Sequence, residues 1–314
     1  MEIPFATALE DAQHILLAGA GGGFDIFAGL PLYYAWRSRG KKVSLANLSF
    51  SVLVPTAGEN LTPDCIAISP DSDGSQAYFP EKHLSAFLHS RGDPAQIWAI
   101  RRTGCKPVAE AYQALADRLK PDAIVLIDGG TDSLMRGDEE GLGTPQEDMA
   151  SILAASAISI AKKFLVCTAF GVDYFHGVGN GHTFEAIAEL TRAGGFRGAF
   201  SLPPDMPEVH FYKDALEYTH RRMPACASIV NTSVLSSMLG FYGNHHTNKR
   251  TEGSELHITP LMSVYWTFLL DHVANRLLYH NLIRNTETYQ ELTIAIETYR
   301  DSLPRLRLHS RALA

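Results

Sequence analysis

Short apolar segments alternate with helical segments over the first two thirds of the chain, and this pattern constrains the fold more than any other feature. Seven apolar runs have the length and residue types of β-strands, at 14–20, 42–48, 64–70, 95–101, 122–128, 163–169 and 198–202. Six further segments predict helices, at about 25–39, 81–90, 106–119, 146–161, 183–193 and 207–221. Alternating strands and helices with short links predict right-handed crossovers. We therefore expect an α/β fold, with a doubly wound, mostly parallel sheet and helices on both faces.

The domain organisation follows from the same links. They are short up to about residue 222, so we expect one α/β domain over 1–314. The last third, 222–314, has a different pattern: the segment LHITPLMSVYWTFLL predicts a strand or a strand pair, and helical segments surround it. This part is either an extension of the same sheet or a small cap, and its boundary is left open.

Charge and composition exclude several classes of protein. The net charge is −7 and basic runs are missing, which argues against a nucleic-acid partner, because phosphate neutralisation needs clustered Lys and Arg. No apolar run approaches the roughly 20 residues of a membrane span. The N-terminus does not resemble a signal peptide, and the four cysteines form no Cys-x-x-Cys pair. We expect a cytoplasmic protein with no membrane partner.

A glycine-rich turn follows the first predicted strand. Gly21, Gly22 and Gly23 precede Phe24 and Asp25, where a helix is expected to begin. Backbone amides of such a turn, next to a helix N-terminus, favour an anionic group. Asp25 either caps the helix or binds a ribose hydroxyl, an amine or a metal. A nicotinamide cofactor (NAD) is not expected, because the next strand ends without the acidic residue that binds its ribose.

The strongest candidate site follows the strand at 122–128. Five carboxylates lie within thirteen residues, namely Asp128, Asp132, Asp138, Glu139 and Glu140. Asp128 ends an apolar strand, so it is expected to be partly buried and to need a partner. The partner could be backbone amides, Arg136 or a divalent cation, and carboxylate oxygens suit Mg²⁺ or Mn²⁺.

Roles can be assigned to these residues as hypotheses. Asp128 and Asp132 would hold the metal or orient a nucleophile, and Asp138 or Glu139 would act as acid or base, because clustered carboxylates raise one another's pKa. The ligand would also contact Gly129, Gly130, Thr131 and Arg136. The competing interpretation is an ordinary solvated acidic loop.

Two later loops carry further candidates. Asp173, His176, Asn180 and His182 stand in a glycine-rich stretch after the strand at 163–169. His176 and Asn180 are candidate ligand contacts, and His182 is a candidate for proton transfer near neutral pH. The loop at 244–251 could supply Lys249 or Arg250 to an anionic group, or be a solvated loop.

One helix start has a recognisable signal. Thr144, Pro145 and Glu147 match a capping box, in which the Thr side chain accepts from the Glu147 amide and the Glu side chain reaches back. We therefore interpret Glu147 as a structural residue.

Three segments together resemble a known family. They are GAGGGFD with the following AGLPLYYAWRSRG, the stretch IDGGTDSLMRGDEEGLGTPQED, and TPLMSVYWTFLLDHVANR. They are similar to the uncharacterised family catalogued as domain of unknown function 1152, over roughly residues 14–300. The resemblance implies a Rossmann-like α/β fold as one unit, and it implies no activity.

The favoured function is divalent-metal-assisted hydrolysis or group transfer on a small polar or nucleotide-like ligand. One alternative is a non-catalytic protein that binds or senses a small ligand. Another is a metal-free lyase, cyclase or isomerase that uses Asp and His. The aromatic runs YYAW and MSVYWTF suit either a homo-oligomer contact or core packing.

Overall fold

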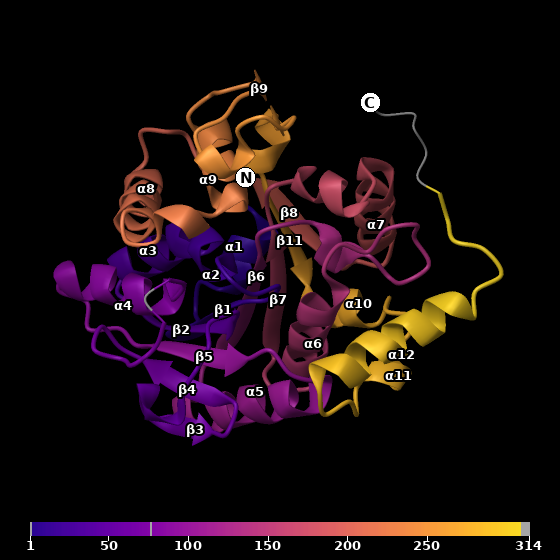
Figure 1. The fold of residues 1–314 in the computed structure, drawn as a ribbon, viewed down its shortest axis with the longest axis horizontal. Coiled ribbons are helices and arrows are strands. Elements are labelled where there is room, and N and C mark those ends of the chain that lie inside the picture. Colours follow the sequence, from indigo (N-terminus) through magenta and orange to yellow (C-terminus); the bar gives the residue numbers. More distant parts are fainter. Residues whose placement is uncertain (1, 76, 309–314) are drawn as a thin grey trace.

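The fold is built on one large mixed sheet with helices packed against it (Figure 1). The computed structural model describes residues 2–75 and 77–308. The nine strands lie in the order β3 (Asn60–Thr62), β4 (Cys65–Ile68), β5 (Ile97–Arg101), β2 (Lys42–Ser49), β1 (His14–Gly19), β6 (Ala123–Asp128), β7 (Lys162–Cys167), β11 (Tyr265–Leu269) and β8 (Phe196–Phe200). The five strands from β5 to β7 are parallel neighbours. The predicted α/β class and mostly parallel sheet are confirmed.

Two strands run against the others. β4 is antiparallel to β5 and pairs with β3 in a tight hairpin, so the predicted strand at 64–70 is not part of the parallel set. The physical reason is that only two residues, Pro63 and Asp64, separate β3 from β4, and so short a connection can join only antiparallel strands. β11 comes from the last third of the chain and is antiparallel to both β7 and β8.

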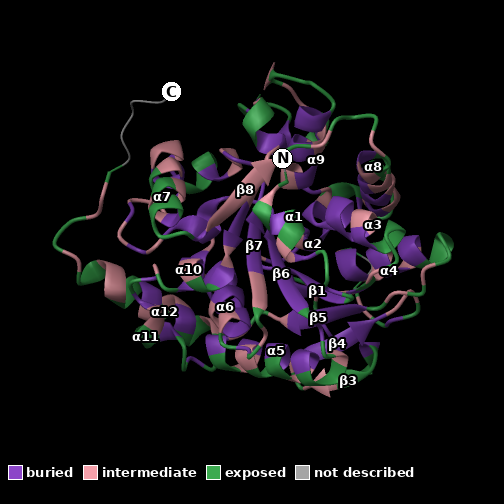
Figure 2. Ribbon diagram, turned by 180° about the vertical axis from the view of Figure 1, so that it is seen from behind, coloured by how far each residue is buried: buried purple, intermediate pink, exposed green. Residues whose placement is uncertain are grey.

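Helices cover both faces of the sheet (Figure 2). They are α1 (Pro4–Ala8), α2 (Asp25–Ala28), α3 (Leu30–Ser38), α4 (Pro80–Ser90), α5 (Cys105–Leu119), α6 (Pro145–Ser156), α7 (Asn180–Arg192), α8 (Pro207–His220), α9 (Ile229–Met238), α10 (Leu270–Ala274), α11 (His280–Ile283) and α12 (Tyr289–Asp301). The strand β1 shows why two layers form. Leu16 and Ala18 belong to one core cluster, and Ile15 and Leu17 to another on the opposite face.

The last third of the chain contributes to several parts of the molecule. Its strand β11 lies within the sheet, and α12 packs against α6. The helix α9 and the short pair β9 (Gly243–Asn244) and β10 (His257–Ile258) lie together at one end of the molecule (Figure 1). Over residues 2–75 and 77–308, no helix combines the length and the apolar character that crossing a membrane requires.

Candidate functional site

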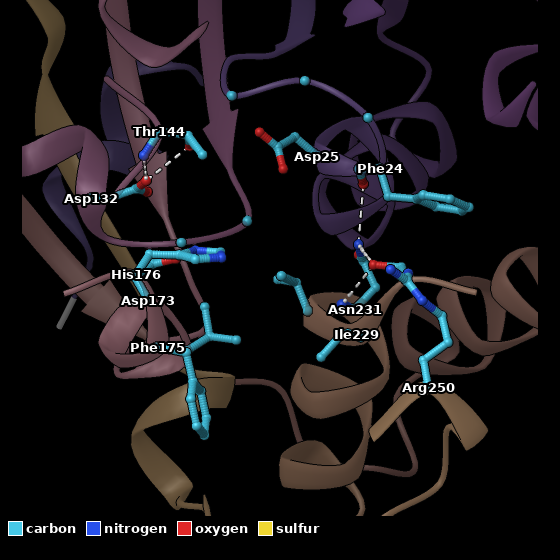
Figure 3. Close-up of a pocket in the computed structure, with 18 of the residues that line it drawn as sticks. Phe24, Asp25, Asp132, Thr144, Asp173, Phe175, His176, Ile229, Asn231 and Arg250 are labelled. Atoms are coloured by element: carbon cyan, nitrogen blue, oxygen red, sulfur yellow. Dashed lines mark hydrogen bonds between the residues drawn. The ribbon is translucent and has the colours of Figure 1, made fainter. Parts of the chain in front are cut away.

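A cavity of about 840 Å³ lies at the carboxyl end of the parallel strands. Its walls are formed by residues that follow β1, β2, β5, β6 and β7, together with the start of α9 and the segment 250–256. From β1 the strands continue outward through β2 and β5 on one side and through β6 and β7 on the other. In open α/β sheets, the crevice at this reversal is where ligands bind. Figure 3 shows Asp25, Asp132 and His176 around one open space, with Ile229 and Asn231 nearby.

Three carboxylates meet beside this cavity. Single oxygen atoms of Asp25, Asp128 and Asp148 lie within 4.8 Å of one another. Asp148 is fully buried and Asp128 is 3% exposed. Among the described residues, Asp25 Oδ2 and Asp148 Oδ1 are buried and have no hydrogen-bond partner. A buried carboxylate oxygen is costly unless it is protonated or is bound by a cation or a hydrogen-bond donor.

Glycines make room for these carboxylates. A Cβ atom on Gly21 would lie 2.4 Å from Asp148 Oδ1 and 2.7 Å from Asp25 Oδ2. One on Gly129 would lie 2.8 Å from Asp25 Oδ1, and one on Gly130 would lie 2.6 Å from an oxygen of Asp173. Any larger residue at these positions would have to displace a carboxylate. The glycines of both loops are therefore needed to accommodate acidic side chains.

The glycine turn borders the cavity, and its role in binding an anionic group stays a prediction. The Asp25 side chain lies against Gly21 and Gly129, and the Gly23 amide donates to the Leu48 carbonyl at 3.2 Å. The Gly22 and Gly23 backbones adopt φ values of 95° and 61°, which favour glycine, and both residues line the cavity. The Gly23 amide therefore binds an acceptor of the protein itself.

The environment favours protonation of several carboxyl groups. Burial raises the pKa of Asp128 to about 8, the charge of Asp132 adds to this, and the Ser133 hydroxyl, 2.5 Å from Asp128 Oδ2, opposes it. Burial also raises the pKa of Asp25, Asp148 and Asp173, and neighbouring aspartates add to each shift. Grouped buried carboxylates with raised pKa values are typical of functional sites.

Asp132 and Asp173 line the same cavity and are held by fixed donors. Asp132 Oδ2 accepts from the Thr144 amide at 2.8 Å and from the Thr144 hydroxyl at 2.9 Å. The predicted capping box is therefore wrong: Thr144 binds Asp132, and Glu147 pairs instead with Arg102 at 3.3 Å. Asp173 accepts from the Thr131 amide at 2.7 Å.

The second half of the acidic stretch does not line the cavity, contrary to our expectation. Arg136 and Arg307 both donate to Asp138, at 3.0 and 2.9 Å. Although burial raises the pKa of Asp138, hydrogen bonds from these arginines hold it below the ordinary value. Glu139 is 1% exposed and accepts from the Arg136 and Gly137 amides and from Arg307. These residues form an ion-pair network, in which the nearby Arg136 and the distant Arg307 supply the positive charges.

The histidine-containing loop is divided between cavity and core. His176 is exposed and lines the cavity. His182 is buried in the first turn of α7, outside the cavity wall, and burial lowers its pKa. Thr131 and Asn180 also lie outside the wall, and the Thr131 hydroxyl lies 3.3 Å from that of Thr183. The structure thus brings His176, but not His182, to the candidate site.

The profile of the family described as protein of unknown function (DUF1152) matches residues 87–299. The chain belongs to this family. A comparison with curated proteins finds no match. The DUF1152 match includes Asp128, Asp148 and the start of α9, whereas Asp25 and the glycine turn precede it. Family membership brings no activity with it, so function has to be argued from the cavity.

The sequence analysis missed several residues of the candidate site. Asp148 resembles an ordinary first-turn acid that complements a helix dipole, so its pattern does not reveal its role. Phe50 and Arg102 directly follow strands β2 and β5, and their position at strand ends could have identified them as cavity residues. Asn231, at the start of α9, had no such signal. Of the two basic residues proposed for the 244–251 loop, Arg250 lines the cavity and Lys249 does not.

Proposed function

We propose that the protein is a divalent-cation-dependent hydrolase or group transferase that acts on a small polar or nucleotide-like ligand. The observation that carries this proposal is the pair of buried, unpartnered oxygens of Asp25 and Asp148, which converge with Asp128 beside the cavity. A cation bound there would satisfy both atoms and would offset the mutual repulsion of the carboxylates. The position of the cavity also fits the Rossmann-like, doubly wound arrangement that we propose for the sheet.

The ligand atoms suit Mg²⁺ or Mn²⁺. Both are hard cations that prefer carboxylate oxygens, and Mg²⁺ binds such oxygens at about 2.0–2.1 Å. Oxygens on opposite sides of an octahedral Mg²⁺ are therefore about 4.2 Å apart. The three oxygens already lie within 4.8 Å of one another. Asp25, Asp128 and Asp148 would supply three of the six ligands of such a cation, and water or substrate oxygens would supply the others.

Two further carboxylates, Asp132 and Asp173, would orient the nucleophile and transfer a proton. Asp132 is fixed by two donors from Thr144 and can orient a water molecule or a hydroxyl nucleophile. Asp173 borders the same cavity and has a raised pKa, mainly because of burial, so we assign proton transfer to it. The cation would polarise the bond that breaks and stabilise the developing negative charge. Asp138 and Glu139, which were candidates from the sequence, are replaced in this role by Asp173.

Binding and turnover test the proposal together. Thermal unfolding would be followed with Mg²⁺, with Mn²⁺ and with EDTA, and turnover would be screened with phosphate esters, nucleotides and other small polar esters. We expect a cation-dependent rise in unfolding temperature in the wild type that Asp128→Asn abolishes. We expect cation-dependent turnover that both Asp128→Asn and Asp132→Asn abolish. The matched control is Asp138→Asn, which removes a carboxylate outside the cavity and should retain both effects.

Each alternative gives a different result in these assays. Turnover that persists in EDTA would contradict the metal-dependent mechanism and favour the metal-free lyase, cyclase or isomerase. A cation and a ligand that both bind, without consumption of the ligand, would favour the binding or sensing protein. No response of the wild type to either cation would refute the proposed metal site.

A further inference from the structure

We infer that the start of α9 and Arg250 form a phosphate subsite beside the carboxylates, and that the ligand of this cavity is a phosphorylated small molecule. The inference rests on the proposed cation site, because the phosphate would bridge the cation and α9. It assigns to α9 and Arg250 the anion-binding role that the sequence had suggested for the glycine turn.

The start of α9 is fixed at the cavity by side chains. The Ser228 hydroxyl accepts from the Asn231 amide at 3.1 Å, and the Asn231 side chain donates to the Phe24 carbonyl at 3.1 Å. Because Phe24 precedes Asp25, this second bond ties α9 to the turn that carries the carboxylate. Ser228, Ile229, Val230 and Asn231 all line the cavity.

This helix end has amides available for a ligand. The first-turn amides of a helix have no carbonyl partner within the helix, and Ser228 takes up only that of Asn231. The amides of Ile229 and Val230 therefore remain at a terminus that carries partial positive charge, which favours phosphate. α9 has ten residues, enough for a developed helix dipole.

Arg250 adds a full positive charge at the same place. Its Nη1 donates to the Ala227 carbonyl at 2.8 Å, directly before the cap of α9. Figure 3 shows the Arg250 side chain extending toward the start of α9. The carbonyl is a neutral acceptor, so it does not cancel the charge. Arg102, on another part of the wall, is paired with Glu147 and is therefore a weaker candidate.

The two subsites are neighbours. A Cβ atom on Gly129 would lie 2.8 Å from Asp25 Oδ1 and 3.2 Å from Val230 Cγ1, so the carboxylate and the first turn of α9 flank one glycine. Asp25 Oδ2 is buried and unpartnered among the described residues, and this observation, independent of α9, supports a cation beside the start of the helix. A free phosphate would be repelled by the carboxylates, and a cation between them removes that repulsion. Phosphate binding should therefore require the cation.

The experiment measures thermal unfolding and calorimetric binding with Mg²⁺ alone, inorganic phosphate alone and both together. In the wild type we expect a shift with Mg²⁺, no shift with phosphate alone, and a further shift with both. Arg250→Ala should weaken phosphate binding at least tenfold and leave the Mg²⁺ shift unchanged. Lys249→Ala, a neighbouring exposed lysine outside the cavity wall, is the matched control and should behave as the wild type.

A second pair of variants tests the helix amides directly. Ile229→Pro removes one amide at the first helical position, where proline is well tolerated, and Ser228 already has an extended backbone that suits a following proline. Ile229→Ala removes the side chain and keeps the amide. We expect Ile229→Pro to lose the phosphate-dependent shift and Ile229→Ala to retain it, with the Mg²⁺ shift present in both.

The outcomes separate this inference from the proposed function. A normal Mg²⁺ shift with no phosphate effect in the wild type, or a phosphate effect that Arg250→Ala leaves intact, would overturn the subsite alone. Phosphate binding that depends on Arg250 but not on Mg²⁺ would retain the subsite and overturn the proposed cation site. Phosphate binding that is unaffected by all the variants would be an adventitious ion only and would overturn the inference.

Discussion

Replacing Asp148 by asparagine is expected to stabilise the metal-free protein and at the same time to abolish its response to a divalent cation. Asparagine has nearly the same shape as aspartate, so the change removes a charge without creating a cavity. Asp148 is fully buried, and its Oδ1 atom has no partner among the described residues. The new amide could also donate a hydrogen bond to Asp25 or Asp128. Opposite effects on stability and on cation binding would be hard to explain by misfolding.

The magnitude follows from the spacing of the carboxylates. Two unit negative charges 4.8 Å apart repel each other by about 3 kcal/mol at an effective dielectric constant of about 20. Because burial keeps part of these groups protonated at neutral pH, we expect a gain of about 1–3 kcal/mol in the free energy of unfolding. One kcal/mol corresponds to about 2–4 °C in unfolding temperature for chains of 150–250 residues. The wild type should gain about 2.7 kcal/mol at a cation concentration one hundred times Kd.

Thermal unfolding at pH 7 in EDTA and in saturating Mg²⁺ measures both effects. Asp138→Asn is the matched control, since Asp138 is ion-paired with Arg136 and Arg307 outside the cavity. That variant should be less stable in EDTA and should keep the full Mg²⁺ shift. The reasoning is refuted if Asp148→Asn is less stable than the wild type in EDTA and still responds to Mg²⁺ as the wild type does.

Three further predictions concern the glycine turn, pH and the C-terminal arginine. Gly21→Ala should abolish the Mg²⁺ shift in thermal unfolding, because its Cβ would lie 2.4 Å from Asp148 Oδ1; an unchanged shift would contradict the site. The pKa values of Asp25, Asp128, Asp148 and Asp173 are raised above the unfolded value of 3.8, so their contribution to stability is fully present below about pH 4 and is lost as the pH rises through the folded-state pKa of each group, which for Asp128 is about 8. Urea unfolding in EDTA at pH 5, 7 and 9 should show that the free energy of unfolding falls as the pH rises, and that it falls less steeply in Asp128→Asn than in the wild type. An equally steep fall in the two proteins would be evidence against this reasoning. Arg307→Ala should lower the free energy of unfolding in urea by about 1–3 kcal/mol, because it leaves the buried Glu139 without its arginine. A loss of the Mg²⁺-dependent shift in unfolding temperature in this variant would contradict our separation of the ion-pair network from the cavity.

The fold was largely predictable because strand burial is a local signal. The apolar run around Leu16 and Leu17 indicated a strand covered on both faces, and the two core clusters confirm this. The antiparallel direction of β4 and the place of β11 within the sheet were not predictable. The place of β11 depends on β7 and β8, which are distant in sequence, and the direction of β4 depends on its hairpin with the short strand β3; local periodicity is insensitive to both.

The site was predictable only where position within the fold determines it. Asp25, Asp128 and Asp132 follow buried strands, so their place at the carboxyl edge followed from the topology. Asp148 could not be recognised, because a first-turn acid usually serves its own helix. The pairing of Glu139 with Arg307 joins residues 168 positions apart, and nothing near Glu139 in the sequence indicates it.

The most direct test of the cation site is anomalous diffraction from crystals soaked in Mn²⁺. The account predicts one strong peak bounded by the carboxylates of Asp25, Asp128 and Asp148, at about 2.0–2.3 Å from their oxygens, as expected for a hard divalent cation. The same soak of Asp148→Asn crystals should show no peak there. A wild-type crystal at saturating Mn²⁺ with no peak between these three residues, or with its strongest peak elsewhere, would contradict the central claim.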